Sequence, residues 1–315
     1  MTEVTHPSGY ATPQAMWAAV SSRGRTAAKA TGIPADKLQR QFVYDRFLAR
    51  LFTYAPDGDW VLKGGTALLA RVRTARHSRD IDLFRRTGTL DNAVTELRAA
   101  AALDLDDHFR FVFTSAAPKF QDERPGQPDS RLATVKITSY AGVTKAADFT
   151  VDVVIGSIIT GDPEPRQSAP TITMPGIEPP RCLLYPVADH IADKVCATFE
   201  RHGSALLPSS RVRDLVDLVV IARTQRVDAD ALRTAIIAER DHRGLDPITR
   251  WACPHQWASS YPRLARDVAE CQEHRTFEAA TAFVGSFLDP ILAAGLINAT
   301  WHPHQRCWTN SALAG

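Results

Sequence analysis

A strand, a glycine turn and a second strand follow one another within residues 60–84, WVLKGGTALLARVRTARHSRDIDLF. Trp60 to Lys63 has the composition of a short strand, Gly64 and Gly65 follow it directly, and Thr66 opens a short helix. Glycine has no Cβ, so the backbone at this turn can approach a bulky anion, and N–H groups at a helix start suit phosphate oxygens. The pattern therefore predicts a phosphate cradle between a strand and a helix.

The second strand of this stretch carries two acids on one face. Asp80 and Asp82 are two residues apart, so their carboxylates leave the same side, whereas Ile81 and Leu83 point into a core. Neighbouring carboxylates repel each other unless a divalent cation lies between them. A phosphate cradle beside such acids predicts nucleotidyl or phosphoryl transfer, with Mg²⁺ or Mn²⁺ as cofactor and a nucleoside triphosphate as substrate.

A third acid lies in a later apolar segment. Residues 148–155, DFTVDVVI, alternate as a strand does, and Asp152 falls on the face opposite the apolar side chains. An acid in such a strand needs a partner, because burying it alone costs several kcal/mol, roughly. A metal shared with Asp80 and Asp82 is one such partner, and Asp148 is the second choice for this position. A sheet-edge aspartate paired with water or arginine is the alternative.

Two helices in the second half carry charged residues beside apolar faces. The helix expected from Pro186 to Glu200 places Lys194 next to an apolar spine, where a surface lysine covering that spine is the plain alternative. The next helix brings Arg211, Asp214 and Asp217 onto one flank, since they are spaced by three residues. Asp217 is interpreted as structural.

Together these segments resemble a known family. Gly64-Gly65-Thr66, followed after thirteen residues by Asp80-Ile81-Asp82, is similar to the signature of the polymerase-β-like nucleotidyltransferases. With the helical segments IADKVCA and SSRVRDLVDL, the pattern resembles the AbiEii/AbiGii (MenT-like) toxin family over about residues 60–225.

The resemblance implies an α+β fold, in which a mixed sheet flanked by helices forms the nucleotidyltransferase core and a helical domain completes the site. It implies that Asp80, Asp82 and Asp152 bind the metal, that Lys194 reaches the triphosphate, and that Asp214 holds Lys194 or Arg211 in place. The other residues that it assigns to the nucleotide are Lys63, Gly64, Gly65, Thr66, Arg76, Ser78 and Arg211.

The resemblance also implies a toxin that adds nucleotides to the 3′ end of tRNA, blocks aminoacylation and is neutralised by an antitoxin. Two alternatives stay open. One is a nucleotidyltransferase or kinase that acts on a protein or a small molecule, and the other is a catalytically silent protein that binds a partner.

Composition and prolines set the remaining expectations. The 315 residues carry a net charge of +2, so any nucleic-acid contact must come from a local patch. Five scattered cysteines, no secretory signal pattern and no apolar run of membrane-spanning length predict a cytoplasmic protein. We expect N-terminal helices over 1–58, the core over 59–160, a proline-rich linker over 161–180 and a helical domain over 181–315. The Trp/His-rich tail after residue 300 is expected to pack onto that helical domain, and RNA stacking is the alternative.

Overall fold

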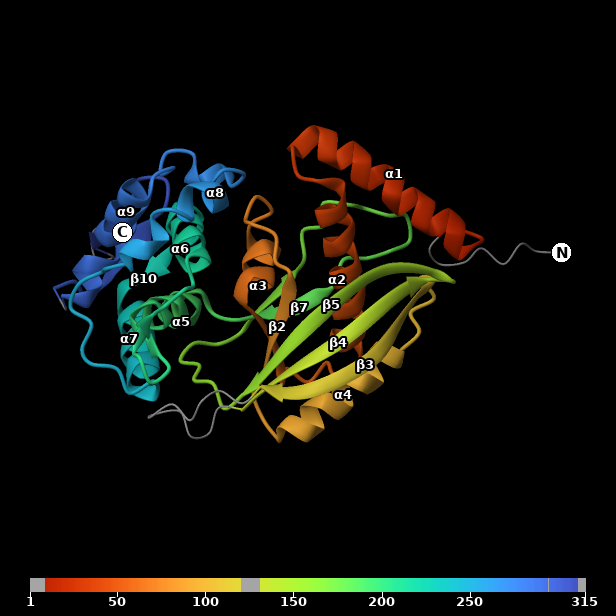
Figure 1. Ribbon diagram of the computed structural model, residues 1–315, viewed down its shortest axis with the longest axis horizontal. Coiled ribbons are helices and arrows are strands. Elements are labelled where there is room, and N and C mark those ends of the chain that lie inside the picture. Colours follow the sequence, from red (N-terminus) through yellow and green to blue (C-terminus); the bar gives the residue numbers. More distant parts are fainter. Residues whose placement is uncertain (1–8, 120–130, 294, 311–315) are drawn as a thin grey trace.

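A mixed β-sheet organises the first half of the chain in the computed structural model, which describes residues 9–119, 131–293 and 295–310 (Figure 1). Its strands are β1 (Trp60–Lys63), β2 (Asp80–Arg85), β3 (Phe109–Lys119), β4 (Arg131–Ala141), β5 (Thr144–Ile155), β6 (Glu164–Gln167) and β7 (Arg181–Leu184). They lie in the order β3-β4-β5-β2-β1-β7-β6. β2 runs parallel to β5 and β1 runs parallel to β7, whereas the other neighbours are antiparallel.

Three helices cover one face of this sheet, and α3 (Gly64–Arg71) lies apart from them. The covering helices are α1 (Pro13–Thr31), α2 (Ala35–Tyr54) and α4 (Leu90–Ala102). Ile81 and Leu83 of β2 pack with these helices in one apolar core, as do Val151 and Val153 of β5. In Figure 1, α2 and α4 lie behind the sheet, and the near face of β3, β4 and β5 carries no helix that the structure describes. The polar side chains of these strands therefore line an open face.

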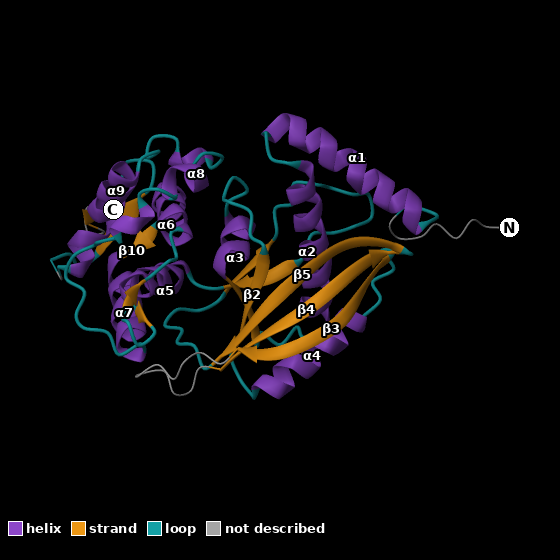
Figure 2. Cartoon of the chain, viewed as in Figure 1, coloured by secondary structure: helices purple, strands orange, loops and turns teal. Residues whose placement is uncertain are grey.

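Helices dominate the second half of the chain (Figure 2). They are α5 (Val187–Phe199), α6 (Arg213–Thr224), α7 (Ala229–His242), α8 (Tyr261–Ala265) and α9 (Phe277–Leu292), with short 3₁₀ turns at His255–Trp257 and Ala269–Cys271. Small strand groups accompany them: β8 (Arg201–His202) with β9 (Leu207–Pro208), and β10 (Val227–Asp228) with β11 (Ala299–His302) and β12 (Cys307–Asn310). Among the described residues, none of the helices combines the length and apolarity of a membrane span.

The tryptophan-rich tail packs onto this helical half. The Trp301 and Trp308 rings lie 4.8 and 5.6 Å from the Phe287 ring, measured between centroids. The Trp301 indole donates to the carbonyl of Ala222 at 2.7 Å, and the Trp308 indole donates to the carbonyl of Phe287. These contacts agree with the packing interpretation of the tail.

The mixed sheet flanked by helices confirms the predicted fold class, but the segment expected as a linker is built into the core. β6 lies inside residues 161–180, and β7 follows directly and pairs with β1. Ile172 and Met174 are buried in the core that also holds α1 and α2. Proline is tolerated in β6 because that strand lies at the sheet edge. The helical half therefore begins at α5, and the helices of the 1–58 segment share one core with the sheet.

The buried carboxyl group of Asp45 in α2 leads to a prediction about how stability depends on pH. Burial raises the pKa of Asp45 to about 7, although a hydrogen bond from Gln41 and the charge of Arg46 act in the opposite direction. A raised folded-state pKa gives stability that is present below about pH 4 and is lost as the pH rises through 7. Asp45→Asn should therefore raise the free energy of unfolding at pH 8 by roughly 2 kcal/mol and leave it unchanged at pH 4. Urea unfolding at both pH values measures this, with Asp57→Asn in an exposed turn as control. An equal gain at both pH values would contradict it.

Candidate active site

Four side chains form one row across neighbouring strands of the sheet. In register, Thr134 of β4 lies opposite Asp152 of β5, Asp152 lies opposite Asp82 of β2, and Asp82 lies opposite Lys63 of β1. Adjacent strands are about 4.8 Å apart, so the two carboxylates lie side by side on the open face. The hydroxyl of Thr134 donates to Asp152 Oδ1 at 2.6 Å. The sheet thus brings together the acids that the sequence placed on separate strands.

Asp82 lies at the centre of this row and has no ion-pair partner in the described part of the chain. No described residue forms an ion pair or hydrogen bond with its half-buried carboxylate. Burial and the negative charges of Asp80 and Asp152 raise the pKa of Asp82 to about 6, and the positive charges of Arg211 and Lys194 offset only part of this. The row therefore holds an excess of negative charge that a cation would stabilise.

The glycine turn faces this acid directly. Gly64 has a φ of +61°, and a Cβ on it would lie 1.9 Å from Asp82 Oδ2. A Cβ on Gly65 would lie 3.1 Å from the hydroxyl of Ser78 and 3.2 Å from Arg76 Nη1. α3 begins at Gly64 without a side-chain cap, so its first N–H groups have no partner within the helix. The structure therefore places these N–H groups next to the carboxylates, and their binding of phosphate stays a prediction.

Hydroxyl groups fix the start of β2. Ser78 donates to Asp80 Oδ1 at 2.9 Å, and Thr66 donates to the main-chain carbonyl of Asp80 at 2.9 Å. Thr66 is buried, so its hydroxyl holds the strand in place rather than facing open space. The ammonium of Lys63 lies 4.3 Å from the centroid of the Tyr185 ring.

A buried ion-pair network joins the sheet to the helical half. Lys194 of α5 donates to Asp214 Oδ1 at 3.0 Å and to Asp217 Oδ2 at 2.6 Å, and its side chain is 2% exposed. Asp217 also accepts from Arg76, which belongs to the loop before β2, at 2.7 Å. Asp214 also accepts from Arg211 at 2.6 Å. Burial lowers the pKa of Lys194, but the charges of Asp214 and Asp217 outweigh burial and the net shift is upward.

The donors fit a divalent cation by their chemistry. Mg²⁺ is typically held by one or two carboxylates together with substrate phosphates, and Asp82 supplies a carboxylate, with no ion pair among the described residues, beside Asp80 and Asp152. Within residues 9–119, 131–293 and 295–310, no three His, Cys, Asp or Glu side chains are arranged as ligands of one ion. The chain therefore offers carboxylates for a cation that the phosphates of a substrate would help to hold.

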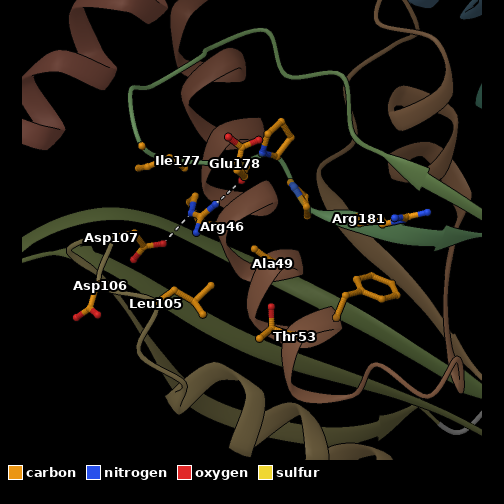
Figure 3. A pocket seen from close by; sticks show the side chains of 13 residues that line it. Arg46, Ala49, Thr53, Leu105, Asp106, Asp107, Ile177, Glu178 and Arg181 are labelled. Carbon is orange, nitrogen blue, oxygen red and sulfur yellow. Dashed lines mark hydrogen bonds and ion pairs between the residues drawn. The ribbon is translucent and has the colours of Figure 1, made fainter. Parts of the chain in front are cut away.

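A separate pocket of about 340 Å³ lies away from these acids, between α2 and residues 176–181 (Figure 3). Arg46 crosses it, donating to Asp107 Oδ2 at 2.7 Å and to the carbonyl of Glu178 at 3.0 Å. None of the residues that the sequence assigned to the site lines this pocket.

Comparison with known proteins identifies the family. The model of the AbiEii nucleotidyltransferase toxins of type IV toxin–antitoxin systems matches residues 46–283. The chain belongs to the AbiEii family. MenT4, a nucleotidyltransferase toxin from Mycobacterium tuberculosis, superimposes with a TM-score of 0.54 at 17% identity, over 87% of this chain and 90% of that one. JHP933 from Helicobacter pylori covers 81% of this chain and 92% of its own at 15% identity, with a TM-score of 0.44. No curated protein matches the sequence.

The residues assigned to the site of this AbiEii-family chain lie in two groups, the acidic row beside the glycine turn and the ion-pair network, and Lys194 lies at the centre of the second group. Its ammonium is enclosed by Asp214 and Asp217, so contact with a triphosphate stays a prediction. Asp217, which the sequence analysis treated as structural, joins Lys194 to Arg76. The sequence signal for this role was an acidic residue inside the apolar run LVDLVV, three positions after Asp214. Thr134 was missed, because its meeting with Asp152 depends on strand register.

The close approach of Gly64 to Asp82 leads to a prediction about the activity of this AbiEii-family protein. Gly64→Ala should lower nucleotide transfer by about 100-fold or more, because the new methyl group must displace the Asp82 carboxylate. Gly32→Ala is the matched control, since Gly32 has a φ of +74° with nothing within 4 Å of the added Cβ. Both variants carry the backbone cost of a left-handed residue, roughly 1 kcal/mol. Initial transfer rates and unfolding temperatures of both proteins measure the effect. Equal activity in the two variants would refute the prediction.

Lys194 generates a prediction about stability. Lys194→Ala removes the cation that two buried carboxylates share and leaves each of them only one arginine, so it should lower the free energy of unfolding by about 3 kcal/mol in the absence of nucleotide. Lys145→Ala is the control, because Lys145 is exposed and pairs with Asp148 at the surface. Urea unfolding without ligand measures both. If Lys194→Ala kept wild-type stability and lost only nucleotide affinity, the ammonium would serve the triphosphate instead.

Proposed function

We propose that this AbiEii-family toxin transfers nucleotides from a nucleoside triphosphate to the 3′ acceptor end of tRNA, in a reaction that needs Mg²⁺ or Mn²⁺. The observation that carries the proposal is the row in which Asp152 and Asp82 lie side by side, with the N-terminus of α3 directly beside Asp82. Carboxylates next to a phosphate-binding helix start suit the transfer of a nucleotidyl group.

Different residues along this row would have different roles in the transfer reaction. Main-chain N–H groups at Gly64 and Gly65 would bind phosphate oxygens, with Arg76 and Ser78 behind them. Asp152, oriented by Thr134, would accept the proton of the acceptor hydroxyl on the opposite side of Asp82. Asp80, Asp82 and Asp152 would hold a divalent cation, which would supply positive charge against the triphosphate, the developing alkoxide and the leaving pyrophosphate.

The proposed reaction has a cellular consequence. Nucleotides added after the terminal adenosine of tRNA would block aminoacylation and translation. We therefore propose that the protein acts in the cytoplasm and that its cognate antitoxin prevents this reaction.

Transfer to total tRNA tests the proposal. The purified protein is incubated with each labelled nucleoside triphosphate, Mg²⁺ and total tRNA, and the products are separated on denaturing gels. Wild type and the Asp148→Asn control, altered on the same face of β5, should label tRNA, whereas Asp82→Asn should lose at least about 100-fold. Chelation of divalent cations should abolish labelling, and tRNA whose 3′ end has been oxidised with periodate should take up no label.

Two results would overturn the proposal. Label in a protein band or a small molecule, and none in RNA, would identify a different acceptor. No label in any product would favour a silent partner-binding protein.

A further inference from the structure

Apart from Lys63, which lies in the acidic row itself, two groups of cations surround this row. The inner ones are neutralised by carboxylates: Arg76 by Asp217, Lys194 by Asp214 and Asp217, and Arg211 by Asp214. Outside them lies a second set that we name the basic rim, and none of its members forms an ion pair with a residue that the structure describes. The basic rim consists of Arg40, Arg79, Lys136 and Arg213.

Lys136 marks the sheet side of the basic rim. On β4 it lies opposite Thr150 of β5, and Thr150 lies opposite Asp80 of β2, which gives a second row next to that of Asp82. Lys136 is exposed and lies two strand spacings, about 10 Å, from Asp80. It is therefore on the Asp152 side of the centre, away from the glycine turn that follows β1.

The other members lie around the start of β2. Arg79 directly precedes Asp80 and is exposed, and its main-chain carbonyl accepts a hydrogen bond from the Tyr44 hydroxyl at 2.7 Å. Arg40 lies one turn before Tyr44 on α2, and therefore on the same flank of that helix. Arg213 is exposed at the first position of α6. Burial of part of its side chain and the positive charges of Arg76 and Arg79 lower the pKa of Arg213, and the charges of Asp80 and Asp217 offset only part of this, so positive charge predominates around these guanidinium groups.

Cations that have no ion-pair partner among the described residues repel one another, and the arrangement becomes favourable when a polyanion binds. The triphosphate would already be served at the other end of the acidic row by the N-terminus of α3. A nucleic-acid strand that delivers a 3′ hydroxyl to Asp152 must enter from the side of β4 and β5, and its backbone phosphates would then pass the basic rim. The net charge of +2 shows that this positive charge is a local feature, as the sequence required of any nucleic-acid contact.

We propose that the basic rim binds the backbone phosphates of the last nucleotides of the acceptor strand and so positions its 3′ hydroxyl over Asp152. This proposal rests on the proposed function, because it assumes an RNA acceptor. It assigns Arg40, Arg79, Lys136 and Arg213 as positioning residues.

Steady-state transfer to tRNA at several KCl concentrations tests the basic rim. The variants are Lys136→Ala, Lys136→Gln and the double variant Arg79→Ala/Arg213→Ala. Arg86→Ala is the control, since Arg86 is exposed just beyond the opposite end of β2. Each lost cation should raise the KM for tRNA by about 3- to 10-fold and reduce the salt slope of log(1/KM) by about 0.7. The KM for the nucleoside triphosphate should stay within about twofold, and Arg86→Ala should behave as wild type.

The outcomes separate the two proposals. If wild type labels tRNA while folded rim variants keep its KM and salt slope, the basic rim does not bind the acceptor and the proposed function stands. If the rim variants raise the KM for the nucleoside triphosphate as much as that for tRNA, the rim serves the nucleotide and the inference is wrong. If wild type labels no tRNA under any condition, the proposed function fails and this inference fails with it. Unfolding temperatures equal to wild type show that the variants are folded.

Discussion

The repulsion between carboxylates on adjacent strands is the constraint on which the site depends. Asp82 and Asp152 are register partners in a parallel pair of strands, and Asp80 lies two residues along the same face. The fold places these carboxylates together, and no described residue forms an ion pair with Asp82. A sheet that served stability alone would avoid this arrangement. The N-terminus of α3 lies on one side of Asp82. Asp152, which accepts a hydrogen bond from the hydroxyl of Thr134, lies on the other side.

The helical half affects the carboxylates of β2 and β5 through the charges of nearby side chains. Lys194 and Arg211 both favour the ionised form of Asp82, yet both are bound to Asp214. Asp217 then connects Lys194 to Arg76, whose guanidinium lies close to Gly65. A chain of charges therefore runs from α5 and α6 to the glycine turn and fixes how the two halves meet. Loss of Lys194 or Asp217 would remove a charge that two other members share at a buried position.

Local patterns in the sequence predicted the parts of the site but not how they meet. Alternation was sufficient to put Asp80 and Asp82 on one face, because side-chain direction in a strand has a period of two. It could not reveal that Asp82 pairs with Asp152 or that Thr134 lies beside it, because pairing between strands distant in sequence is set by tertiary packing. The resemblance implied that Asp214 holds Lys194, and the ion pair is present, but the second partner of Lys194, Asp217, was missed for the same reason. The short strands on either side of residues 168–180 were hidden because a proline-rich composition is typical of linkers.

The central claim is that the carboxylates of β2 and β5 share one divalent cation, and Mn²⁺ binding followed by electron paramagnetic resonance tests it most directly. In the presence of a non-hydrolysable nucleoside triphosphate, wild type and Asp148→Asn should bind Mn²⁺ alike. Asp82→Asn and Asp152→Asn should each weaken binding by about tenfold or more. Equal Mn²⁺ affinity in all four proteins would show that these acids do not share an ion, and the account would be wrong.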